Sequence, residues 1–433
     1  MTYHPVVDRF AIPIPLDPGS AAIFVAVFVA AALLTARRPS YGLGGLILAM
    51  PFALAREFLG TTVTLPKVVL VGVLIGLTTY PGCAGRLRDR PMPLLLGMLG
   101  IYLAITALSV VDAAHRGATL RETLKVGEYA ALFIAAYLCY RLDADDKAIA
   151  GAIAIAAIFV SLSALAQEII GAPSGLYVGK AIVPRIAGVL EGPNQLAGYF
   201  QVAIAALGAW TLTRRSTLLD AALGLATFAD VLTFSRAGLF GLVVVGSVLA
   251  LAGGRTALRA LRPAYLGLAA GLGMVGWWAF YAHTANVLRV SLEASAYAGG
   301  VGNRGELWGA AWRMWLHHPL LGVGAGNYEL ELPQYGVFGV RTHANSWFLQ
   351  SLAEGGIALF AATVALIVTI VATFARRLRG GGPSPWVLAA FAASTALALH
   401  QVADYLVFYP KVGGPWWLLL GIGAAALARD AGA

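Results

Sequence analysis

Residues 346–375 read SWFLQSLAEGGIALFAATVALIVTIVATFA. A helix needs about 20 apolar residues to cross the hydrocarbon core of a bilayer, and this segment is longer than that. Glu354 is the one charged residue in it. The segment therefore predicts a membrane-spanning helix.

Comparable apolar runs occupy most of the chain. Hydrophobic residues make up 59% of the sequence and charged residues 12%, with a mean hydropathy of +0.77, which is typical of polytopic membrane proteins. We expect one all-α integral membrane domain over residues 1–433, with 12 or 13 transmembrane helices because several runs are short. The runs lie near residues 20–36, 41–56, 63–80, 92–111, 126–141, 148–169, 195–213, 218–234, 237–253, 265–282, 346–375, 385–408 and 415–428.

Basic residues predict the orientation of these helices. They cluster on alternate loops, and the positive-inside rule assigns those loops to the cytoplasm. This use of the positive charge points to a membrane and not to nucleic acid as the partner. The side of the N-terminus depends on whether there are 12 or 13 helices. The clusters include Arg37, Arg38, Arg86, Arg88, Arg90, Arg141, Lys147, Arg214, Arg215, Arg255, Arg259, Arg262, Arg376, Arg377 and Arg379.

The opposite, external loops also keep positive charge, which runs against the orientation rule. We interpret this charge as a binding site for a polyanion at the outer membrane boundary, because arginine forms paired, charge-assisted bonds to phosphate. The alternative for any single residue is contact with solvent or lipid headgroups. The external basic residues are Lys180, Arg185, Arg236, Arg289, Arg304, Arg313, Arg341 and Lys411.

The longest external segment, residues 283–345, carries the densest set of polar residues. Within it we predict a helix from Arg304 to Trp315, capped by Asn303, with three tryptophans on one face that favour the membrane interface. Gly322–Gly326 predicts a tight turn. His343, at the mouth of the following span, is a candidate general base near neutral pH. The alternative is an interfacial histidine bonded to a neighbouring loop.

Further polar residues lie outside this segment or inside the spans. Arg236 lies in a tight turn, where a lipid-linked phosphate would be a suitable partner. Pro193 predicts a helix start at which the Asn194 and Gln195 amides favour anions. His400 and Asp404 are expected on one helical face, as a structural pair or as support for the site, and Glu354 is expected to be structural. The Asp143-Ala144-Asp145 sequence resembles a metal-binding pair, but it lies on a predicted cytoplasmic loop, and we interpret it as solvated.

These segments resemble a known family. NRGELWGAAWRMWLHHPLLGVGAGNYE at residues 303–329 and HANSWFLQSLAEGG at residues 343–356 are similar to the signature region of the O-antigen ligase and O-antigen polymerase superfamily. The SRAG turn at 235–238 and the GPNQLAGY segment at 192–199 are similar in content and order. The resemblance covers roughly residues 180–360 and implies a GT-C-like glycosyltransferase bundle.

The resemblance implies a function and a set of site residues. O-antigen ligases transfer a polysaccharide from undecaprenyl pyrophosphate to the lipid A–core on the periplasmic face of the Gram-negative inner membrane. It implies that Arg236 and Arg304 hold the donor pyrophosphate and that His343 activates the acceptor hydroxyl, with no metal or cofactor. Further donor-binding candidates are Lys180, Arg185, Arg289, Arg341, Asn194 and Gln195, and candidate supporting residues are Asn345, Glu354, His400 and Asp404.

Two other functions remain open at the level of sequence. A polysaccharide polymerase would use the same lipid-linked donor but a different acceptor. A transporter would use the intramembrane ionisable groups as an ion path, although no inverted repeat of broken helices is visible. A protein-glycosylating transferase of the same superfamily fits less well, because such enzymes usually carry a larger soluble C-terminal region.

Overall fold

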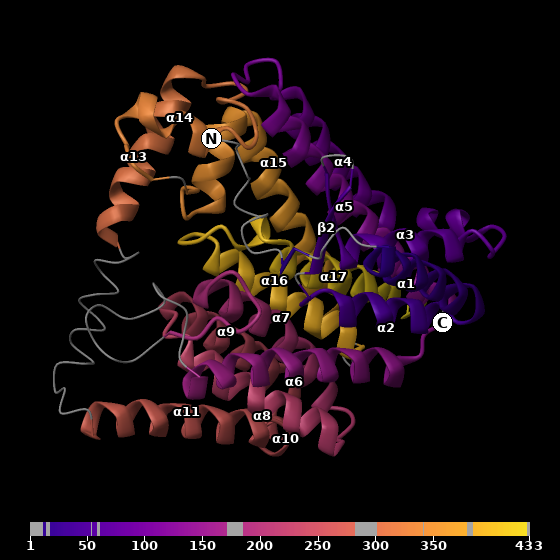
Figure 1. Ribbon diagram of the computed structural model, residues 1–433. Coiled ribbons are helices and arrows are strands. Elements are labelled where there is room, and N and C mark those ends of the chain that lie inside the picture. Colours follow the sequence, from indigo (N-terminus) through magenta and orange to yellow (C-terminus); the bar gives the residue numbers. More distant parts are fainter. Residues whose placement is uncertain are drawn as a thin grey trace.

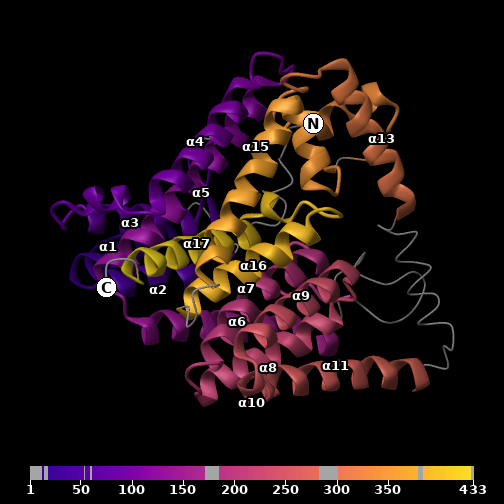
Figure 2. The ribbon, with the colours of Figure 1, turned by 180° about the vertical axis from the view of Figure 1, so that it is seen from behind.

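The computed structural model describes residues 12–13, 18–52, 54–58, 61–170, 185–281, 301–340, 342–378 and 384–430. The chain forms a helical bundle, shown from two sides in Figures 1 and 2. Its α-helices are α1 (Pro18–Arg37), α2 (Pro39–Ala49), α3 (Leu65–Leu77), α4 (Met92–Leu108), α5 (Arg116–Leu142), α6 (Asp146–Ile170), α7 (Pro193–Thr211), α8 (Thr217–Leu232), α9 (Arg236–Gly253), α10 (Arg255–Ala260), α11 (Arg262–Tyr281), α13 (Val301–His317), α14 (Tyr328–Glu331), α15 (Trp347–Leu378), α16 (Pro385–His400) and α17 (Pro410–Asp430).

Short 3₁₀ segments and a small sheet complete the described structure. The 3₁₀ segments are η2 (Cys83–Arg88), η3 (Leu332–Tyr335) and η4 (Leu406–Phe408). Strand β1 (Ile12–Pro13) pairs in parallel with β2 (Leu54–Phe58), which pairs antiparallel with β3 (Thr61–Thr64). The sequence did not predict these strands.

Every predicted apolar run contains a helix, but their lengths differ. Among the described residues, α1, α6, α9, α15 and α17 are long and apolar enough to cross a membrane, and α3, α4 and α16 are apolar but shorter. The run expected at 41–56 supplies only α2, because Pro51, which lacks a backbone N–H, follows directly and the chain continues into β2. The total of 12 or 13 spans stays a prediction.

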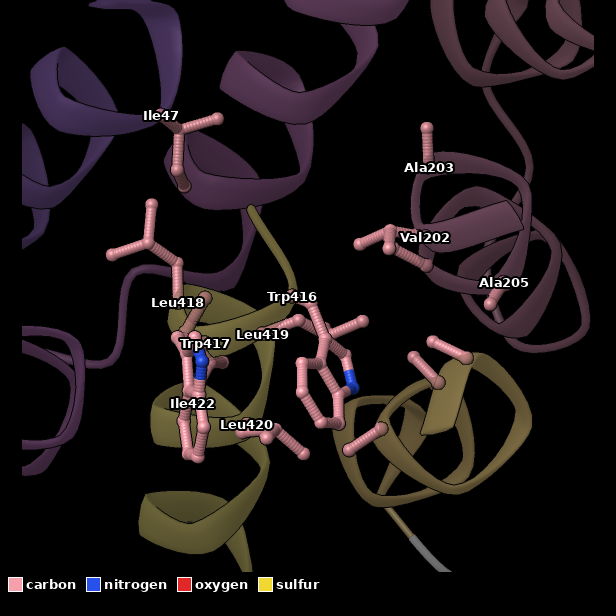
Figure 3. Close-up of a cluster of buried hydrophobic side chains, with 14 of the residues drawn as sticks. Ile47, Val202, Ala203, Ala205, Trp416, Trp417, Leu418, Leu419, Leu420 and Ile422 are labelled. Carbon is pink, nitrogen blue, oxygen red and sulfur yellow. The ribbon is translucent and has the colours of Figure 1, made fainter. Parts of the chain in front are cut away.

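Helix α17 lies in the centre of the bundle. It packs against α5, α7 and α16, and Figure 3 shows its tryptophans and leucines against Ile47 of α2 and Val202 of α7. Glycines allow the close approach: a Cβ at Gly421 would lie 2.4 Å from the carbonyl oxygen of Phe133. Small residues at helix contacts are the usual means of close packing within a membrane, where lipid tails are as apolar as the side chains.

Three of the loops that the sequence assigns to the cytoplasm meet at one end of the bundle. Arg38 pairs with Asp143 at 3.5 Å and with Asp145 at 3.3 Å, and Arg141 pairs with Asp89 at 2.6 Å. These contacts join the α1–α2, α3–α4 and α5–α6 loops into what we call the Arg38 end. Asp143 also accepts bonds from Ser40, so the interpretation of this acidic segment as simply solvated is wrong.

The segment between α13 and α15 is folded and has a small core of its own. Leu307, Met314 and Tyr328 are buried together there. The helix predicted over Arg304–Trp315 is confirmed as α13, but it begins at Val301, so Asn303 lies inside it and is not its cap.

A kink in α15 attaches this folded segment to the bundle. Gly355 and Gly356 leave the helical conformation, which frees backbone groups of α15 to bond elsewhere. Val323 N donates to Ala353 O at 2.9 Å and Ile357 N donates to Pro319 O at 2.9 Å. Gly356 has φ +60°, and a Cβ there would lie 2.3 Å from the Leu320 carbonyl, so the kink requires glycine. Figure 1 shows α13 and α14 beside the upper part of α15.

Candidate active site

The described parts of several predicted external loops, namely those before α7, α9, α15 and α17, meet at the other end of the bundle, which we call the His343 end. Trp347 N lies 3.0 Å from both Gln401 O and Asp404 O, which joins the start of α15 to the loop after α16. Lys411 Nζ donates to Val189 O at 2.5 Å and pairs with the buried Glu191 at 3.4 Å. The loops before α7, α15 and α17 are thereby held together.

Arg185 is the connecting residue of this end. Its Nε donates to Thr233 O at 3.0 Å, and an Nη donates to Asn194 Oδ1 at 3.0 Å. The Asn194 amide in turn donates to Asp404 Oδ2 at 2.7 Å. Asn194 therefore links a cation to a buried carboxylate, and it does not present a free amide to an anion as the sequence suggested.

Three arginines gather around this connection. Burial lowers the pKa of Arg185 to about 10; the charge of Asp404 raises that pKa, and the charges of Arg304 and Arg236 lower it. These four residues come from four separate segments of the chain. Their mutual influence means that the fold concentrates positive charge here, and the Asp404 carboxylate offsets part of it.

Local structure explains how Arg236 and Arg304 are presented. Arg236 is the first residue of α9, whose N-cap Ser235 accepts a bond from Gly238 N at 3.1 Å, and its side chain is exposed. Arg304 lies in the first turn of α13, and its Nε is a buried atom without a hydrogen-bond partner among the described residues. Helix N-termini attract anions, so both placements favour a negatively charged ligand.

His343 is buried in an aromatic cage close to Arg304. Its ring lies 5.8 Å from that of Tyr405 and 5.7 Å from those of Phe408 and Tyr409. Nε2 lies 2.9 Å from the Tyr409 hydroxyl, and the Asn345 N–H donates to Nδ1 at 3.2 Å. Because Nδ1 accepts, the proton of the neutral ring is on Nε2, which donates to Tyr409.

The electrostatic environment keeps His343 neutral. Burial lowers its pKa below 6.5; the charge of Asp404 opposes this shift, whereas those of Lys125 and Arg304 add to it. Lys125 Nζ lies 3.9 Å from the centre of the Phe408 ring and 2.6 Å from Glu122. An uncharged imidazole at neutral pH is the form that can accept a proton.

The remaining candidates have different positions. Glu354 accepts bonds from the Tyr328 backbone N–H at 3.1 Å and from Gln350 at 2.8 Å, which is a structural arrangement. Gln195 interacts with the Tyr409 hydroxyl. Asn345 has φ +50° and contacts His343 through its backbone. Lys180, Arg289 and Arg341 lie outside the described residues.

The expectation that His400 and Asp404 share a helical face is wrong. Helix α16 ends at His400, and Asp404 lies in the following loop, where it bonds to Asn194 and to the Tyr405 N–H. The loop that follows is tied to the start of α15, because the Trp347 N–H binds the carbonyls of Gln401 and Asp404. His400 Nδ1 instead faces Gln201 at 2.8 Å.

Sequence reasoning did not single out Tyr409, Lys125 or Gln201. Glu122 and Lys125 lie three residues apart just before the apolar run at 126–141, and in α5 such a spacing places them on one helix face. Tyr409 follows an apolar run and carries no distinctive pattern. Its role depends on a contact over 66 residues.

Fold and site together define a helical membrane protein with a cationic, histidine-containing site at one end. Residues 221–364 match the family model described as O-antigen ligase. This match supports an O-antigen ligase-type family assignment for the chain, in agreement with the resemblance found in its sequence. The matched region contains Arg236, Arg304 and His343, whereas Arg185, Asn194 and Asp404 lie outside it. A comparison with curated proteins gave no match.

Proposed function

We propose that the chain is an O-antigen ligase that transfers a polysaccharide from undecaprenyl pyrophosphate to a hydroxyl of the lipid A–core oligosaccharide. The family match supports a glycosyltransferase-like role in polysaccharide assembly. The finer proposal is carried by the convergence of Arg236 and Arg304 on Arg185, together with the proximity of Arg304 to the neutral His343. The site faces the periplasm of a Gram-negative inner membrane in this proposal, since its loops are opposite the strongly basic Arg38 end.

The arginines bind the donor through its pyrophosphate. Guanidinium groups form paired, charge-assisted bonds to phosphate oxygens and keep their charge at all physiological pH values. Their bonds strengthen as negative charge develops on the leaving diphosphate, so they stabilise the transition state more than the bound donor. Arg304 Nε, which has no hydrogen-bond partner in the part of the chain that the structure describes, is one donor available for this purpose.

His343 acts on the acceptor. The acceptor oxygen attacks the anomeric carbon, its proton passes to the imidazole, and the carbon–oxygen bond to the diphosphate breaks with its electron pair leaving on undecaprenyl pyrophosphate. Nδ1 holds the lone pair, and the 3.2 Å bond from the Asn345 N–H must be given up when it accepts the proton. Nε2–H remains bonded to Tyr409 and keeps the ring oriented. A single displacement of this kind inverts the anomeric configuration.

The reaction draws its driving force from the activated lipid donor and is proposed to need no metal. Arginine charge takes the place that a divalent cation has in many glycosyltransferases. We expect transfer to continue in the presence of a chelator.

Deletion of the gene and analysis of lipopolysaccharide by gel test the proposal. A ligase is indicated when long-chain material disappears from lipid A–core while the lipid-linked polymer is still made. Core carrying a single repeat unit would indicate a polymerase instead. Loss of the lipid-linked polymer from the periplasmic side, with transfer intact in extracts, would indicate a transporter.

A further inference from the structure

His400, at the end of α16, has one partnered and one unpartnered ring nitrogen. The residue is 1% exposed. Nδ1 lies 2.8 Å from Gln201 Nε2. Nε2 is a buried atom with no hydrogen-bond partner in the described part of the chain.

The surroundings of Gln201 determine which ring nitrogen carries the proton. Gln201 Nε2 also lies 3.5 Å from Ala237 O and 3.4 Å from Gly238 O. Two carbonyl oxygens require that the amide nitrogen faces them, since the amide oxygen would be repelled. The amide nitrogen therefore donates to Nδ1 of His400, and the proton of the neutral ring is on Nε2.

The result is a buried N–H donor without an acceptor, which native proteins generally avoid unless a ligand or water completes the bond. It lies beside the proposed donor site. The first turn of α9, which contacts Gln201, begins with Arg236, and the charges of Asp404 and Arg304 both act on the His400 ring. Arg304 Nε is a second unpartnered donor in the same region.

We propose that His400 Nε2–H donates a hydrogen bond to a phosphate oxygen of the lipid-linked diphosphate, alongside Arg304. This inference rests on the proposed function. A phosphate oxygen accepts hydrogen bonds and carries negative charge, so it suits both the neutral N–H of His400 and the neighbouring Arg304 guanidinium. His400 Nε2 and Arg304 Nε are covered in the free chain, so side chains at this end rearrange when the ligand enters.

Binding of inorganic pyrophosphate to the full-length protein in lipid nanodiscs tests this assignment. We expect H400F to weaken binding about ten-fold, the effect of losing one hydrogen bond to a charged group. H400Q places an amide N–H near the Nε2 position and is expected to stay within about three-fold of the wild type. H317F is the matched control, because His317 lies at the far end of α13 and packs on Tyr335.

The outcomes separate the inference from the proposed function. If H400F binds pyrophosphate like the wild type while R304Q binds it more weakly, the role of His400 is wrong and the diphosphate site stands. If the wild type does not bind pyrophosphate, both are wrong. If H400F fails to fold, ring-¹⁵N NMR of the histidines in the wild-type protein tests the proposal instead. The signal of the protonated Nε2 of His400 must shift on addition of pyrophosphate. An unchanged signal overturns the proposal.

Discussion

Tyr409 and His343 are joined by a hydrogen bond of 2.9 Å between the phenol oxygen and Nε2. The Asn345 N–H, 3.2 Å from Nδ1 on the other side of the ring, places the histidine proton on the nitrogen that faces Tyr409. The two bonds therefore fix both the orientation and the tautomer of the imidazole. Such orienting partners of a catalytic histidine commonly matter for activity even though they do not touch the substrate.

We expect Y409F to lower kcat by roughly ten-fold, with little change in the KM for either substrate, because the ring loses its orienting acceptor but the arginines remain. Steady-state transfer between purified donor and acceptor lipids measures both constants. Y335F is the control, because Tyr335 lies in η3, where its ring packs on His317 and not in the aromatic cage around His343. A Y409F enzyme with wild-type kcat would show that this bond is not used.

The pH dependence of kcat/KM reports the charge state of His343. The folded pKa is below 6.5, so the neutral base is populated at pH 7 and activity falls only on the acid side of about 6.5. K125Q removes a positive charge that lowers the pKa of His343, so the fall of kcat/KM on the acid side (the acid limb) should move to higher pH. D404N removes a negative charge that raises this pKa, so the acid limb should move to lower pH. Shifts in the opposite directions would contradict the assignment of the limb to His343.

Asn194 couples Arg185 to Asp404, and its removal affects stability and donor binding together. N194A leaves a buried carboxylate without one of its donors, which costs about 1–3 kcal/mol of folding free energy. The KM for the lipid-linked donor should rise as Arg185 loses its orientation. A double-mutant cycle with R185Q measures the coupling, and strictly additive effects would rule out the connection.

The kink at Gly356 is required for docking of the segment that carries Arg304. G356A combines a positive φ with a clash against the Leu320 carbonyl and should lower the melting temperature and the activity. G246A is the matched control, because a Cβ there meets nothing within 4 Å and alanine favours the α9 helix. Equal melting temperatures for the two variants would show that the kink tolerates a side chain.

The positions of the helices could be predicted from sequence because apolar length is a direct requirement of the bilayer. The ends of the helices could not. Leu406, Val407 and Phe408 extend the apolar run of α16, but they form η4 in a buried loop, so their hydrophobicity says nothing about helical conformation. Because the predicted run extended to residue 408, His400 and Asp404 were incorrectly placed on one helical face.

Part of the candidate site was visible for an electrostatic reason. Arg236 and Arg304 stand out because positive charge on the predicted outer side of a membrane protein opposes the orientation rule, and His343 stands out as a possible base at the mouth of a span. Tyr409 and the bridging role of Asn194 depend on contacts between segments 66 and 210 residues apart. A tyrosine and an amide have no pattern in sequence that distinguishes these contacts from ordinary interfacial ones.

Single-turnover transfer by purified protein in proteoliposomes, with an undecaprenyl pyrophosphate-linked glycan and lipid A–core as substrates and a chelator present, tests the central claim most directly. We predict glycosylated lipid A–core with inverted anomeric configuration from the wild type. H343A should bind the donor but form no product, and R304Q should lose donor affinity. Transfer by H343A at the wild-type rate, with its fold intact, would contradict the account.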